Sequence, residues 1–118
     1  MIRRQKEQLS VQAEKPQNGN GLLIMKKILN GPDELDQKGR AFNHCFWDPG
    51  SGLGYHKHNG TMETMYILKG EAEYVDEKGD KTVLYPGDVT ITDSGQGHSI
   101  YAIGTETLEF IALVLFKE

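Results

Sequence analysis

The amino-acid sequence predicts an all-β fold that closes into a small barrel. The 118 residues include 14 glycines, which help to divide the chain into short runs of apolar residues. β-branched and aromatic residues are abundant in the second half, as is typical of strands separated by turns. A chain of this length can bury a core as one domain without disulfides. The single cysteine, Cys45, has no second cysteine to pair with inside the chain.

The first thirty residues are expected to form a strand segment in front of this barrel. Apolar and polar residues alternate over residues 9–14, which is a period-two strand pattern. Residues 15–21 are polar and are expected to form a loop. Residues 22–29 could be strand or helix by pattern, and the breaker at residues 30–32 favours a strand. We expect residues 1–30 to pack on the barrel or on a partner subunit; the alternative is a disordered tail.

The remaining residues, 31–118, are expected to form a single domain. Residues 33–40 are polar and charged, and we interpret them as a solvated connector. Turn signals then separate the strand that carries two histidines (His56 and His58) from further predicted strands over residues 41–47, 63–68, 71–76, 82–85, 89–92, 98–103 and 107–116. The pattern does not decide which face of residues 41–47 lines the barrel, because both faces are partly apolar.

A group of metal-ligating residue types lies on the fourth predicted strand and at the start of the fifth. His56 and His58 are one residue apart, so in an extended chain both imidazoles point to the same face. Asn59 and Gly60 are a turn signal that brings Glu63 back beside the two rings. Two imidazoles and a carboxylate are ligands of transition metals. A fourth candidate, His98, follows the polar loop over residues 93–97.

The spacing of these residues resembles the two motifs of the cupin superfamily. The first motif, G-x5-H-x-H-x4-E-x6-G, is matched at all its fixed positions, namely Gly50, His56, His58, Glu63 and Gly70. The second motif, G-x5-P-x-G-x2-H-x3-N, is matched at Gly87, Gly95 and His98. Asp93 replaces its proline and Ala102 replaces its asparagine. Neither of these two positions carries a ligand, so the differences concern the shape of the loop.

This resemblance implies a fold and a metal site. The expected fold is the double-stranded β-helix, or jelly-roll, barrel of a small single-domain cupin. The implied metal ligands are His56, His58, Glu63 and His98. Three nitrogens and one oxygen suit a divalent transition metal ion such as Mn, Fe, Co, Ni, Cu or Zn, and the sequence does not choose among them. Four protein ligands around a six-coordinate ion leave two positions for water, dioxygen or a substrate.

Four further residues are candidates for the pocket around this site. His44 could be an additional acid or base, although a histidine on the outer face is the commoner case. Tyr55 and Tyr101 lie near the ligands in the sequence and could line the pocket mouth, or could be ordinary barrel aromatics. Met65 shares a strand face with Glu63, which would place it in the barrel interior.

Composition excludes several classes of partner. The net charge is −4 and the basic residues are scattered, which argues against nucleic-acid binding. The longest apolar run, residues 110–116, is too short to span a bilayer, and no signal peptide is evident. We therefore expect a soluble cytoplasmic protein. Small cupins of this kind commonly pair, and the resemblance implies a homodimer.

Three functions remain open at the level of the sequence. The first is a metal-dependent enzyme that acts on a small oxygen-bearing molecule. The second is a metal-containing module that binds or senses such a molecule without turnover. The third is a structural metal that stiffens the barrel. The fold family covers several activities, so the sequence does not decide among these possibilities.

Overall fold

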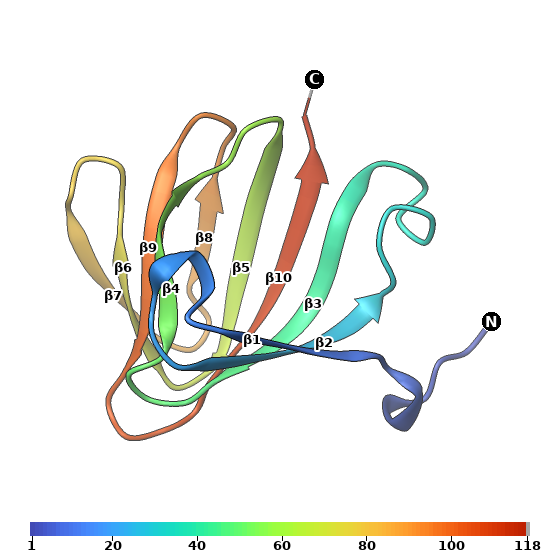
Figure 1. Cartoon of the computed structure of the whole chain (residues 1–118), viewed down its shortest axis with the longest axis horizontal. Helices are drawn as coiled ribbons and strands as arrows, with labels where there is room; N and C mark the ends of the chain where they lie inside the picture. Colours follow the sequence, from blue (N-terminus) through green and yellow to red (C-terminus); the bar gives the residue numbers. More distant parts are fainter. Residues whose placement is uncertain (118) are drawn as a thin grey trace.

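The computed structural model describes residues 1–117 and consists of two antiparallel sheets that face each other (Figure 1). The larger sheet has the strand order β1 (Ser10–Glu14), β2 (Leu22–Leu29), β3 (Gly39–Trp47), β10 (Leu108–Phe116), β5 (Thr61–Lys69) and β8 (Val89–Thr92). The smaller sheet has the order β4 (Gly52–Lys57), β9 (Gly97–Ile103), β6 (Glu71–Val75) and β7 (Lys81–Leu84). Two short 3-10 helices, η1 (Gln5–Glu7) and η2 (Pro16–Asn18), flank β1. The predicted all-β jelly-roll fold is confirmed.

The core lies between the two sheets. The larger sheet contributes large side chains, of which Trp47 and Phe110 meet edge to face with their ring centroids 4.8 Å apart. The smaller sheet contributes small and branched side chains, including Ile100 and Ala102. Burying such side chains stabilises the fold by about 25 cal/mol for each Å² of apolar surface removed from water. Within residues 1–117, neither helical segment has the length and apolar character of a membrane span.

The N-terminal segment is part of the larger sheet. β1 pairs with β2, and β2 pairs with β3, in antiparallel register. The loop between β1 and β2 then crosses to the smaller sheet and lies against β4 (Figure 1). There the backbones of Asn20 and Gly52 exchange two hydrogen bonds, with N···O distances of 3.1 and 2.9 Å. This loop closes one side of the barrel.

The strand β3 has one face inside the barrel and one outside. Cys45 and Trp47 are buried in the core, and Ala41 lines the interior with them. β3 begins at Gly39, two residues before its predicted start at Ala41. Arg40 has no opposite residue in the register, because β10 pairs Val114 with Ala41 and Leu115 with Gly39. This β-bulge brings Arg40 to the rim of the barrel; an extra residue of this kind commonly redirects a side chain.

Candidate metal centre

Three neighbouring strands bring His56, His58, Glu63 and His98 together, and we call these four residues the histidine cluster. His56 lies near the end of β4 and is the direct partner of His98 on β9. His58 follows β4 immediately, and Glu63 is the third residue of β5. The structure thus brings the first three residues and His98 to one place. All four side chains offer ligand atoms that lie within 4.8 Å of one another.

Two glycine-containing turns hold this arrangement. Gly60 has φ +74° in the turn between His58 and Glu63, and Gly95 has φ +87° in the loop before His98. Side chains other than glycine adopt such angles only with strain. The two turns are bound to each other, because the amide of Gly95 donates to the carbonyl oxygen of His58 over 2.6 Å. The position of His58 is thereby tied to the loop that carries His98.

The rest of that loop is held by its own polar side chains. Gln96 Oε1 accepts from the amide of Asp93 at 2.9 Å, and Asp93 Oδ1 accepts from the amide of Ser94 at 2.8 Å. Lys117 Nζ also contacts Asp93 at 2.8 Å. Asp93 and Gln96 therefore act as turn residues, and the loop forms without the proline of the cupin motif.

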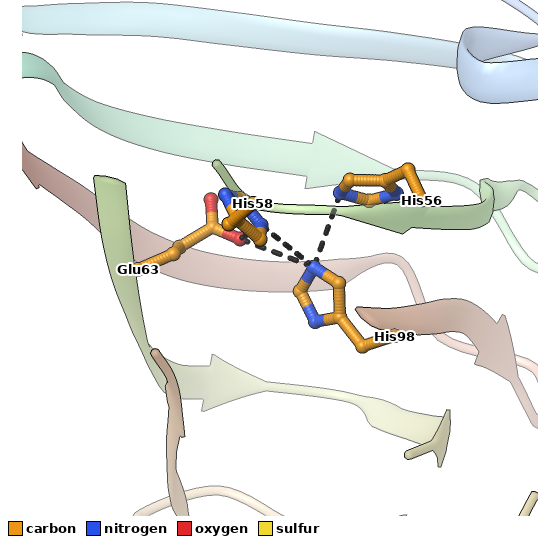
Figure 2. Close-up of side chains that lie close together, drawn as sticks. All are labelled: His56, His58, Glu63 and His98. Carbon is orange, nitrogen blue, oxygen red and sulfur yellow. Dashed lines mark hydrogen bonds and ion pairs between the residues drawn. The ribbon is translucent and has the colours of Figure 1, made fainter. Parts of the chain in front are cut away.

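The ring nitrogens of the histidine cluster converge on one point (Figure 2). His98 Nε2 lies 3.1 Å from Nε2 of His58 and 3.1 Å from Nε2 of His56. Glu63 Oε1 lies 3.3 Å from Nε2 of His58 and 3.4 Å from Nε2 of His98. Two ligand atoms that are each about 2.1 Å from an ion are about 3.0 Å apart at a right angle and about 3.4 Å apart at the tetrahedral angle. The observed separations therefore suit a single ion.

The far side of each imidazole has its own hydrogen-bond partner. His56 Nδ1 donates to the carbonyl oxygen of Gly54 at 2.8 Å, which leaves Nε2 of the neutral ring unprotonated. His58 Nδ1 lies 3.3 Å from Thr61 Oγ1, and His98 Nδ1 lies 3.2 Å from Thr92 Oγ1. Partners of this kind are typical of metal-binding histidines, because they fix the ring orientation and aim Nε2 at the ion.

The electrostatics of the cluster also favour a cation. His98 is 0% exposed, and burial lowers the pKa of its imidazole to about 4, so the ring is neutral at physiological pH. Glu63 Oε1 is buried and has no hydrogen-bond partner among the described residues. A buried carboxylate oxygen facing imidazole lone pairs is costly without a positive charge between them. The residues present therefore fit a divalent metal ion.

The four candidate pocket residues have different locations. Met65 is buried in the barrel interior with Cys45 and Trp47, where strand parity places it. His44 lies on the other face of β3, where its Nε2 is 3.3 Å from Glu109 Oε2 and its ring is 4.3 Å from that of Phe46. The structure does not bring His44 to the histidine cluster.

The two tyrosines lie on the outer side of the smaller sheet. Tyr55 packs over Gly97, at the place where a β-carbon on that glycine would lie. Tyr101 packs over Gly52 in the same way. Each is an odd number of residues from the histidine on its own strand, so strand alternation turns it away from the cluster. Neither residue is found at the mouth of the cavity that reaches the cluster.

A cavity of about 380 Å³ opens onto the histidine cluster and contains residues that the sequence analysis did not select. Its lining includes Arg40, Lys57 and Gln17 beside His56, His58 and Glu63. The sequence carries no local signal for Arg40 or Gln17, because the first depends on a bulge and the second has a left-handed backbone (φ +52°) in the β1–β2 loop. Thr61 and Thr92 were also missed, since their hydroxyl contacts depend on the fold.

The fold and this cluster define a cupin, and comparison with known proteins gives the same class. The cupin domain family matches residues 43–115, more than half of the chain, so the chain belongs to the cupin family. It is 39% identical over 97 residues to a protein named oxalate-binding protein from Thermotoga maritima, covering 82% of this chain and 78% of that protein.

Solved structures also resemble this chain, one of them along nearly its whole length. The crystal structure of a predicted oxalate decarboxylase from Thermotoga maritima superposes with a TM-score of 0.91 at 35% identity, covering 99% of this chain and 100% of that one. An uncharacterized conserved protein with a double-stranded β-helix domain from Klebsiella pneumoniae superposes with a TM-score of 0.67 at 27% identity, covering 79% and 71% of the two chains.

Proposed function

We propose that the protein binds a small oxygen-bearing molecule, with a carboxylate as the first candidate, at a divalent metal ion held by His56, His58, Glu63 and His98. The observation that carries this proposal is the convergence of three Nε2 atoms and one carboxylate oxygen, with 3.1 to 3.4 Å between His98 and the two other rings and between Glu63 and the rings of His58 and His98. The donor set suits Mn, Fe, Co, Ni, Cu or Zn. When bound, such an ion supplies Lewis-acid character and coordination positions for ligand oxygens.

Each part of the chain has a distinct task in this proposal. Glu63 offsets part of the charge of the ion, and the threonines behind His58 and His98 hold the rings in place. The cavity of about 380 Å³ lets a molecule approach from the side of His56 and His58. The names of the two Thermotoga maritima relatives both refer to oxalate, which supports a small carboxylate as the first molecule to test.

Binding is favoured over acid–base catalysis by the composition of this cavity. Its lining contains no carboxylate and no imidazole outside the histidine cluster, within the part of the chain that the structure describes. Arg40 stays protonated in proteins, which leaves Lys57 as the remaining side chain there that could exchange a proton. A reaction that needs a general acid or base would have few groups to use. Metal-dependent turnover of the ligand is the alternative function.

Metal content and ligand titration test the proposal. The protein is stripped with a chelator, reloaded with each candidate metal in turn and assayed for bound metal, with one ion per chain expected. His56→Ala and His58→Ala are expected to lower occupancy, whereas His44→Ala, outside the cluster, is the matched control. Full occupancy in both cluster variants would overturn the metal assignment.

Ligand binding is measured on the same preparations. Oxalate is titrated calorimetrically into metal-loaded and metal-free protein, and heat is expected only with the metal. Equal heats would show that the ligand does not use the ion. Loss of oxalate over time in the metal-loaded sample would favour the enzymatic alternative.

We also propose that two copies associate through the outer face of the larger sheet. Tyr66 and Val89 are direct partners on β5 and β8, and they are 48% and 56% exposed. Leu68 and Ile91 enlarge this apolar surface, which water solvates poorly. Light scattering is expected to give a dimer mass, and Ile91→Glu should lower it. A monomer mass at micromolar concentration would overturn the proposal.

We propose that the N-terminal segment, residues 1–30, packs on the single barrel domain of residues 31–118 and stabilises it. β1 lies at the edge of the larger sheet, and η2 contacts β4. Deletion of residues 1–20 is therefore expected to lower solubility or to weaken association. An unchanged dimer with unchanged solubility would make this segment dispensable.

A further inference from the structure

We propose that the preferred ligand is a short amphipathic carboxylate, whose charged end lies between the histidine cluster and Arg40 and whose apolar end enters a separate inner cavity. This inference rests on the proposed function and narrows its ligand to a chemical class. The proposal rests on two adjoining compartments, an outer one suited to an anion and an inner one that is apolar. Oxalate, which has a carboxylate at each end, would fill only the first.

The outer compartment is suited to an anion. Arg40 and Lys57 line it, and neither forms an ion pair or a side-chain hydrogen bond within residues 1–117. The surplus of positive charge is local, because the whole chain has a net charge of −4. Glu63 is the carboxylate of this lining, and it faces the ring nitrogens of His58 and His98. Arginine is suited to such a task, because its planar donors match a carboxylate in two-point contacts.

The bulge in β3 sets the position of Arg40. Gly39 and Ala41 have partners on β10, and Arg40 lies between them without one. Ala41 lines the inner cavity and Arg40 lines the outer one, so two consecutive residues of one strand reach the two compartments. Bulges beside a binding site commonly have this effect on a side chain.

The inner compartment is an apolar cavity of about 110 Å³. Its walls include Leu23, Met25, Trp47, Met65 and Phe110, with Asn43 and Glu63 as the polar exceptions. An engineered apolar cavity of about 150 Å³ in another protein stays dry and binds benzene. A cavity of the size found here therefore has room for about three or four carbon atoms.

The two compartments meet beside the histidine cluster. Leu53 and Glu63 line both of them. The β1–β2 loop also spans the junction, because Pro16 lines the inner cavity and Gln17 lines the outer one. A molecule bound at the cluster could therefore extend an apolar group past Leu53 into the interior. Short 2-oxo acids have this shape, since two adjacent oxygens are followed by an alkyl chain.

A chain-length series tests the inner compartment directly. Co²⁺-loaded protein, first shown by metal analysis to hold its ion, is titrated calorimetrically with oxalate, pyruvate, 2-oxobutanoate, 2-oxopentanoate and 2-oxooctanoate. Affinity is expected to rise about fourfold for each added methylene up to 2-oxopentanoate, which is the usual effect of burying such a group. It should fall for 2-oxooctanoate, whose chain exceeds the cavity. A flat or falling series overturns the proposal while leaving metal binding intact.

Two variants locate the alkyl chain. Ala41→Leu and Ala112→Val each reduce the inner cavity from a different strand, so that one remains informative if the other folds poorly. Both should lower the affinity for 2-oxopentanoate at least about tenfold more than the affinity for oxalate, because the space for about two methylenes is lost. Ala13→Leu on β1 adds the same atoms outside the cavity and is expected to change neither affinity. Equal losses for both ligands would contradict an inner subsite.

Arg40→Gln tests the charged end. The variant should weaken binding of every acid in the series by on the order of tenfold, which is typical for loss of a charged hydrogen bond. Arg4→Gln makes the same change in net charge near the N-terminus and is the matched control. Unchanged affinities in Arg40→Gln would remove Arg40 from the site. Absence of bound metal in the unmodified protein after reloading with each candidate metal would instead overturn the proposed function itself.

Discussion

The hydroxyl oxygen of Thr92 lies 3.2 Å from Nδ1 of His98, on the side of the ring that faces away from the histidine cluster. The same hydroxyl lies 2.9 Å from the phenol oxygen of Tyr74, so a chain of three side chains leads from the outer part of the barrel to the cluster. Thr92 is 1% exposed, so water cannot easily take the place of its hydroxyl as the hydrogen-bond partner of His98. This contact fixes the orientation of the most buried histidine of the site.

Thr92→Val should therefore weaken metal binding while leaving the four cluster residues unchanged. Valine has nearly the shape of threonine but cannot accept from Nδ1, so His98 loses its orienting partner. We expect metal affinity to fall about 10-fold to 100-fold, measured by competition with a chelating dye. Tyr74→Phe removes the more distant hydroxyl and should have a smaller effect. Equal affinities in Thr92→Val and the unmodified protein would contradict an orienting role.

Glu63→Gln should have opposite effects on the metal-free and metal-loaded proteins. Without metal, the substitution removes a buried charge whose Oε1 has no hydrogen-bond partner among the described residues, so the melting temperature should stay equal or rise. With metal, the missing charge weakens binding. A 100-fold loss of affinity would reduce the metal-linked stabilisation by about 2.7 kcal/mol. Thermal melting with metal and with a chelator measures both effects, and a parallel loss in both states would contradict this account.

The stability of the metal-free protein should fall as pH is lowered from about 6.5 to about 4. The folded-state pKa of His98 is lowered to about 4, chiefly by burial, whereas an unfolded histidine has a pKa of about 6.5. Between these values the unfolded chain takes up a proton that the folded chain does not, so acid favours unfolding. The full effect is on the order of 3 kcal/mol. Urea unfolding in the presence of a chelator, at pH 4 to 8, measures it.

The same urea unfolding of metal-loaded protein and of histidine variants shows which residues cause the pH dependence. Protons compete with the metal at three histidines, so the metal-loaded protein should lose stability more steeply and approach the chelated protein at low pH. Metal-free His98→Gln should lose most of the pH dependence, and His44→Gln should retain it. Superimposed metal-loaded and chelated curves across the whole range would mean that these histidines do not hold the ion.

Cys45 should be almost unreactive while the protein is folded. It is 3% exposed, and burial, with a smaller contribution from the charge of Glu63, raises the pKa of its thiol from 9.0 to about 12. The reactive thiolate is therefore about a thousandfold scarcer at neutral pH than for an ordinary cysteine. Labelling with a coloured thiol reagent should proceed at that reduced rate or slower, and should become fast in urea. Fast labelling of the folded protein would show that solvent reaches the inner cavity freely.

The fold and the four cluster residues were predictable because their signals are local. Strand alternation places His56 and His58 on one face, and Asn59 with Gly60 reverses the chain before Glu63. The strand over residues 22–29 was bounded correctly by its flanking breakers. The same alternation could have excluded Tyr55 and Tyr101 from the pocket, since each lies an odd number of residues from its neighbouring histidine.

Residues whose positions depend on distant parts of the chain were not predictable in this way. Arg40 looked like part of a solvated connector, and its place at the barrel rim depends on how β3 pairs with β10. The inner face of β3 also became clear only from its neighbours, because both faces of that strand are partly apolar. Thr92 reaches His98 across a turn whose shape the sequence alone does not specify.

The position of β10 has a consequence for synthesis of the protein. This strand follows β3 and β5 in the chain, yet it lies between them in the larger sheet (Figure 1). While the ribosome still holds β10, β3 and β5 have emerged with open edges that can pair with other nascent chains. Completion of the larger sheet must therefore wait until β10 has left the ribosome. A stalled or prematurely terminated chain would leave the edges of β3 and β5 unpaired and is expected to bind chaperones. A truncation at the N-terminus would leave the pairing of β10 with β3 and β5 intact.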